Sequence, residues 1–182
     1  MSESGAGTER VFFALWPPTE LARRMSAIAD ELAVSGRRMP PENLHITLAF
    51  IGDVAPERLR LLEAIGDQLP KHPLTLTLDR TGHWRRPGIT WVGPSEPPAA
   101  AAELHQVLQT ALAEAEFPSA QRPFKPHVTL ARKSRPPRQK AIEPLTWRVT
   151  RLALVASRRS KQGAHYEIHR EWSLPVNASS GV

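Results

Sequence analysis

A short motif occurs twice in the chain, and this repeat constrains the fold more than any other feature of the sequence. The first copy, residues 43–50, reads NLHITLAF, and the second, residues 125–132, reads KPHVTLAR. With 7 histidines in 182 residues, the shared pattern His-[Ile/Val]-Thr-Leu is expected by chance roughly 0.004 times. The repeat therefore predicts two halves of similar structure, each contributing one copy.

Each copy predicts a β-strand, in which side chains two residues apart share a face. His45 therefore lies on the same face as Thr47. In the second copy, His127 lies on the same face as Thr129. Four apolar residues of the motifs point to the opposite face, into apolar packing: Ile46, Leu48, Val128 and Leu130. If the halves pack about a pseudo-twofold axis, two imidazoles and two hydroxyls converge in one cleft.

The rest of the pattern mixes strands and helices without strict alternation, which is typical of an α+β fold with antiparallel sheets. Strands are predicted over residues 11–16, 44–51, 74–78, 89–92, 127–132, 145–156 and 165–174. Helices are predicted over about 21–32, 56–69 and 104–112. Thr19 is the expected N-cap of the first helix. The strand over 74–78 is expected to pair with 89–92. We expect one domain over residues 1–182, with flexible tails at 1–9 and 177–182.

Composition narrows the class of protein. The net charge of +6 favours polyanionic partners such as nucleic acid. The absence of cysteine excludes disulfides and a thiol nucleophile. The apolar run Val11–Trp16 is too short for a signal peptide or a membrane span. We therefore expect a cytoplasmic protein, with no membrane partner, that acts as a monomer.

The repeated residues suit the hydrolysis of a cyclic phosphodiester. This reaction needs a base to activate water and an acid to protonate the leaving oxygen. Histidine, with an unperturbed pKa near 6.5, can fill either role. The hydroxyls of Thr47 and Thr129 can donate to phosphate oxygens as negative charge develops there. No metal or cofactor is expected, because no His-rich or carboxylate-rich ligand spacing surrounds either motif.

At these residues the chain resembles the two-histidine (2H) phosphoesterase superfamily, and within it the bacterial RNA 2′,3′-cyclic phosphodiesterases, historically called 2′-5′ RNA ligases. The resemblance covers about residues 10–174, including a middle hairpin with Trp84 and a C-terminal signature with Tyr166. It implies a bilobal pseudo-twofold fold, with antiparallel sheets lining a central cleft and helices outside. It also implies conversion of RNA 2′,3′-cyclic phosphate ends to 2′-phosphates, with His45 as proton donor and His127 as proton acceptor.

Further substrate-binding residues are less strongly indicated. Arg132 occupies a position where this family often has arginine, but on a flat strand it would point away from His127. It could reach a phosphate only at a strand end or a β-bulge. Phe124, just before the second motif, could stack on a base. Phe50 is expected in the core. The five histidines without repeated context are treated as non-catalytic: His72, His83, His105, His165 and His169.

Two other functions fit the same sequence. The chemistry could act instead on 2′-5′ linked oligonucleotides, or run in reverse as a weak RNA ligase, since the walls of the cleft decide the substrate. The chain could also be an RNA-binding module without catalysis. The presence of both histidines argues against the second alternative, because a binding module needs charge and stacking surfaces but no acid–base pair.

Overall fold

The computed structural model describes residues 7–120, 122–137, 141–160 and 163–176. Most of the two predicted tails, namely residues 1–6 and 177–182, lies outside this part of the chain. The described helices are α1 (Thr19–Glu31), α2 (Pro56–Gln68), α3 (Ala99–Glu114) and the short 3₁₀ helix η1 (Pro41–Asn43). The described strands are β1 (Glu9–Leu15), β2 (Arg37–Arg38), β3 (Ile46–Val54), β4 (Leu74–Leu78), β5 (Arg80–Trp84), β6 (Ile89–Gly93), β7 (Val128–Arg132), β8 (Leu145–Val149), β9 (Arg151–Ser160) and β10 (Gly163–Ser173).

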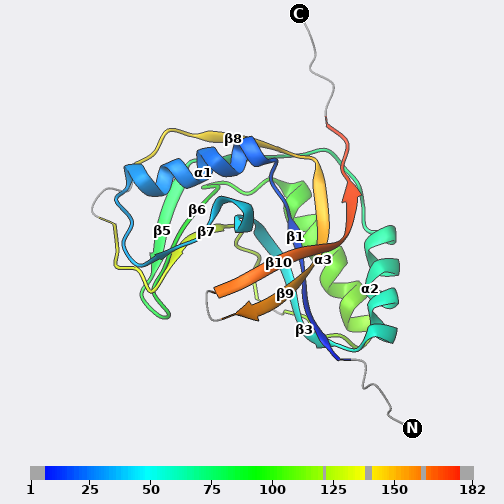
Figure 1. The fold of residues 1–182 in the computed structure, drawn as a ribbon. Coiled ribbons are helices and arrows are strands. Elements are labelled where there is room, and N and C mark those ends of the chain that lie inside the picture. The colour runs from blue at the N-terminus through cyan, green and yellow to red at the C-terminus, as the bar shows by residue number, and fades with distance from the viewer. Residues whose placement is uncertain (1–6, 121, 138–140, 161–162, 177–182) are drawn as a thin grey trace, which may run out of the picture.

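A large antiparallel sheet runs through both halves, in the order β10-β9-β1-β3-β7-β6-β5, with β2 paired to β7. The two motif strands, β3 and β7, are neighbours at its centre. A separate two-stranded sheet joins β4 to β8. Helices α2 and α3 lie together beside the half that contains β1, β9 and β10, whereas α1 lies over the other half (Figure 1). This arrangement confirms the predicted α+β class with antiparallel sheets. Within the described residues, no helix is long and apolar enough to cross a membrane.

The two faces of the large sheet have different roles. One face packs against the helices and forms the main core, which includes all four apolar motif residues that were predicted to be buried: Ile46, Leu48, Val128 and Leu130. The other face carries a second, smaller apolar cluster around Phe12, Ala14 and Trp16. Because this second cluster lies on the face of His45, it forms the floor beneath that histidine.

One predicted strand pairing was wrong, one predicted strand is divided in two, and one strand was not predicted. Residues 74–78 pair with β8 and not with 89–92, which instead pairs with β5 and β7. The segment 145–156 was predicted as one strand, but Thr150 separates β8 from β9. The strand over residues 80–84 was not predicted, because its Gly and Arg content is typical of a connection. Each of these differences depends on which distant strand is adjacent, and a local pattern does not contain that information.

Two local predictions were also wrong. Thr19 was expected to cap α1, but it is the first helical residue, and Pro18 occupies the N-cap without a side-chain hydrogen bond. Phe50 was expected in the core, yet 52% of its surface is exposed, and the Arg10 guanidinium lies 4.9 Å from the centre of its ring.

Candidate active site

The two motif histidines directly precede adjacent strands and lie close together. Strands β3 and β7 pair at Ile46 and Val128, which directly follow His45 and His127. The positive charges of His127 and Arg132 are near enough to lower the pKa of His45. The sheet therefore brings together the two histidines that the repeat singled out.

His45 is held by two neighbours in its own motif. Its Nδ1 donates to the Asn43 carbonyl at 2.7 Å, and its Nε2 lies 3.1 Å from Thr47 Oγ1. This second contact confirms that His45 and Thr47 share a face. With Nδ1 protonated, Nε2 of the neutral ring is the acceptor, and it faces the threonine hydroxyl.

Aromatic side chains enclose His45. Trp16 stacks on the imidazole, with ring centroids 5.1 Å apart and an interplanar angle of 3°. Phe12 lies at 4.9 Å, and Tyr166 contacts the ring edge-on at 5.3 Å. Burial among these rings disfavours the charged imidazolium and lowers the pKa of His45 to about 4. With this pKa, His45 is neutral at pH 7 in the free protein.

His127 repeats this arrangement in a more open setting. Its Nδ1 donates to the Lys125 carbonyl at 2.8 Å. Lys125 is two residues before His127, just as Asn43, the acceptor for His45, is two residues before that histidine. Trp84 contacts the ring edge-on at 4.5 Å. Burial also lowers the pKa of His127, and the nearby Arg132 lowers it further. Thr129 is half-buried beside two fully buried neighbours, as expected for a residue on the cleft face.

A β-bulge brings Arg132 to the cleft face. In β7, Thr129 pairs with Trp91 and Ala131 with Thr90, so Leu130 is the extra residue of a bulge. The bulge reverses the alternation, and Arg132 returns to the face of His127. Its charge lowers the pKa of both catalytic candidates. A β-bulge is one of the two conditions under which the sequence predicted that Arg132 could reach a phosphate.

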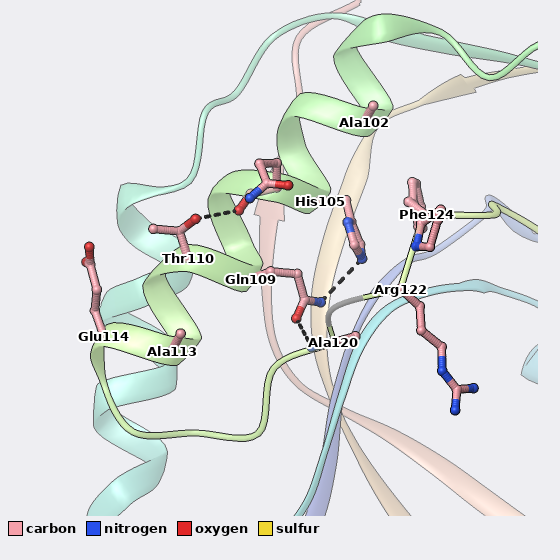
Figure 2. Close-up of a pocket in the computed structure, with 11 residues that line it drawn as sticks. Ala102, His105, Gln109, Thr110, Ala113, Glu114, Ala120, Arg122 and Phe124 are labelled. Atoms are coloured by element: carbon pink, nitrogen blue, oxygen red, sulfur yellow. Dashed lines mark hydrogen bonds between the residues drawn. The ribbon is translucent and has the colours of Figure 1, made fainter.

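Phe124, which the sequence suggested could stack on a base, lines two cavities and has one face of its ring covered. One face of its ring stacks on His105, with centroids 4.4 Å apart and an interplanar angle of 11°. His105 in turn lies 3.3 Å from Gln109, whose side chain also accepts from the backbone N–H of Ala120 (Figure 2). Phe124 thus separates this α3 pocket from a second cavity that contains His127.

Sequence reasoning did not identify most of the cleft walls. Trp16 was predicted only as the end of a strand, and Tyr166 was noted only as part of the C-terminal signature. Trp84 and Trp91 lie on the cleft face because Trp91 pairs with both Gly82 and Thr129. Alternation along residues 80–84 would have indicated Trp84, had that segment been recognised as a strand.

Comparisons with known proteins identify the family of this site. A family model described as the 2′-5′ RNA ligase superfamily matches residues 17–161. The chain belongs to the 2′-5′ RNA ligase superfamily. An RNA 2′,3′-cyclic phosphodiesterase of Escherichia coli (strain K12) is 31% identical over 91% of this chain and 97% of its own length. Another superfamily member with that name, from Thermus thermophilus, is 31% identical over 91% of this chain and 90% of its own.

Solved structures of superfamily members agree with the fold. The crystal structure of E. coli LigT in apo form matches with a TM-score of 0.81 and 30% identity, and covers 92% of this chain and 98% of that one. LigT has also been solved in complex with 3′-AMP, at the same TM-score and coverage. The predicted 2H phosphoesterase fold is therefore confirmed.

Proposed function

We propose that the protein hydrolyses RNA 2′,3′-cyclic phosphate ends to 2′-phosphomonoesters, by acid–base catalysis that needs no metal ion. One observation carries this proposal: two histidines, each with Nδ1 bonded to the carbonyl two residues earlier, share a cleft face with a threonine of the same motif. The activity named for the E. coli and Thermus relatives supports it. We further propose that the protein acts as a single-domain monomer in the cytoplasm.

The proposed reaction is an in-line displacement at phosphorus. Water attacks the phosphorus and gives its proton to Nε2 of His127. The bond from phosphorus to O3′ breaks, and Nε2 of His45 donates a proton to O3′. The products are a 2′-phosphomonoester and a free 3′-hydroxyl. Backbone carbonyls fix both Nδ1 protons, so both Nε2 atoms face the reaction.

The other motif residues stabilise charge on the phosphoryl group. Thr47 and Thr129 donate hydrogen bonds to the non-bridging oxygens, on which negative charge increases in the transition state. Arg132 supplies a permanent positive charge on the same face.

Substrate charge also sets the protonation of His45. In the free protein, burial keeps this histidine neutral at pH 7, with a pKa of about 4. A bound phosphodiester carries a negative charge, which favours the imidazolium and raises the pKa. Substrate binding therefore prepares His45 as the acid, whereas His127 must be neutral to serve as the base.

A product assay tests the proposal. An oligoribonucleotide ending in a 2′,3′-cyclic phosphate is incubated with the protein in EDTA, in parallel with His45→Ala and His127→Ala, and the terminal phosphate is identified. We expect a 2′-phosphate from the intact protein, with at least a roughly 10²-fold lower rate for each variant. A 3′-phosphate product, or turnover by both variants at the original rate, would refute the mechanism. A ligated product, or cleavage of 2′-5′ linked oligonucleotides alone, would favour the alternative substrates.

A further inference from the structure

The two histidines have unequal surroundings. The imidazole of His45 packs against the rings of three aromatic residues, Phe12, Trp16 and Tyr166. His127 instead lines a cavity of about 310 Å³. The pseudo-twofold symmetry of the motifs therefore does not extend to the walls. The cavity beside His127 has room for a ligand larger than the phosphate.

The cavity beside His127 combines aromatic rings with positive charge. Trp84, Trp91 and Phe124 contribute rings, and Arg80 and Lys125 contribute exposed cationic side chains. Neither cation forms an ion pair with a carboxylate among the residues that the structure describes. Stacking rings beside free cations are the usual means of binding single-stranded RNA, with the bases on the rings and phosphates near the cations.

The aromatic wall is built into the sheet. Trp91 lies across Gly82 on the neighbouring strand, where an added Cβ would come within 2.1 Å of the indole ring. Trp84 then packs against Trp91, with ring centroids 5.4 Å apart, and reaches the edge of His127. Asp79, the residue before Arg80, accepts hydrogen bonds from the backbone N–H and the hydroxyl of Ser95, each at 2.7 Å.

We propose that this cavity binds the nucleotide that precedes the cyclic phosphate end. Its base packs against Trp84 and Trp91, and the phosphate that links it to the terminal nucleotide lies near Arg80 and Lys125. The inference rests on the proposed function, because it assumes that the reacting phosphate lies between the histidines. Its consequence is a preference for RNA ends over free cyclic mononucleotides.

Paired substrates test the inference. The value of kcat/KM is measured for adenosine 2′,3′-cyclic phosphate and for the dinucleotide ApA ending in a 2′,3′-cyclic phosphate. We expect the dinucleotide to be preferred at least about tenfold, as stacking of one base implies. Arg80→Gln and Trp84→Ala should reduce this ratio, whereas Trp84→Phe, which keeps a ring, should preserve most of it. Arg60→Gln, an exposed arginine on α2, is the matched control and should leave the ratio unchanged.

Two outcomes would overturn the inference: equal kcat/KM for both substrates, or a preference that survives both Arg80→Gln and Trp84→Ala. Absence of turnover of either substrate would instead contradict the proposed function. In that event, calorimetry with 2′-AMP and with ApA carrying a terminal 2′-phosphate still decides the matter. Tighter binding of the dinucleotide, lost in Arg80→Gln, supports the cavity, and equal binding of the two ligands rejects it.

Discussion

Leu48 and Leu130 occupy the same position in the two motifs, and each is the extra residue of a β-bulge. In β3, Thr47 pairs with Ala14 and Ala49 with Phe13, which leaves Leu48 unpaired, as Leu130 is in β7. Both side chains are buried in the core. The repeat therefore encodes a shared backbone irregularity as well as shared side chains.

The two bulges determine which residue after each His-x-Thr motif points to the cleft face. After the bulge, the residue five positions beyond each histidine returns to the histidine face, which places Arg132 in one half and Phe50 in the other at equivalent positions. This explains why Phe50 is exposed although simple alternation predicted a core position. The two halves share a scaffold but present different chemistry at this point.

Removal of either histidine should abolish most of the activity. We expect His45→Ala and His127→Ala to lower kcat/KM for a cyclic phosphate RNA end by roughly 10²–10⁴-fold, the usual contribution of general acid–base catalysis. Steady-state kinetics checks this. His72→Ala, which replaces an exposed histidine outside the cleft, is the control and should retain full activity. A comparable loss in that control would indicate a general effect on folding.

The pH dependence of kcat/KM should be a bell displaced to acid pH. The base must be neutral and the acid protonated, so the maximum lies between their pKa values in the free protein. Burial lowers the pKa of both histidines below 6.5, and that of His45 to about 4. We therefore expect a maximum below about pH 6.5. A rate profile from pH 4 to 9 measures it, and a flat profile or an alkaline maximum would be inconsistent with this pair.

His45 should also make folding stability depend on pH. Its folded pKa of about 4 lies below the unfolded value of 6.5, so the unfolded chain binds more protons between these values. Stability therefore falls as the pH decreases through this window, by about 3 kcal/mol from His45 alone. Urea unfolding at pH 7 and pH 4.5 measures this for the wild type and for His45→Gln. The variant should lose less stability than the wild type, and an identical loss would contradict the assigned burial effect.

The sequence predicted the centre of the site better than its surroundings, for a physical reason. The spacing of His45 and Thr47 is local, because side chains two residues apart on a strand share a face. A bulge such as that at Leu130 is a property of pairing with β6, and the position of Trp84 depends on β5 joining that same sheet. These are contacts between distant segments, which periodicity along the chain does not specify.

Arg132 should set both phosphate affinity and the pKa of His45. Its charge lowers that pKa, so Arg132→Gln should raise it. The same substitution removes a cation from the proposed phosphate site and should weaken binding of inorganic phosphate about tenfold or more. NMR titration of the imidazole protons and calorimetry measure the two effects, with Arg60→Gln as the control. If neither quantity changed, the guanidinium would not be facing the cleft.

Protein stability should be sensitive to a single methyl group added at Gly82, because the Trp91 indole packs against this glycine. Gly82→Ala would place a Cβ 2.1 Å from the indole ring, whereas Gly7→Ala meets no atom within 4 Å and is the matched control. The clash should destabilise the protein by about 1–3 kcal/mol, as overpacking usually does. Because Trp91 supports Trp84, and Trp84 contacts His127, kcat/KM should fall as well. Denaturant unfolding and kinetics on both variants measure these effects. Equal stability of the two variants would show that Trp91 can move without cost, and the wall beside His127 would then be adaptable rather than fixed.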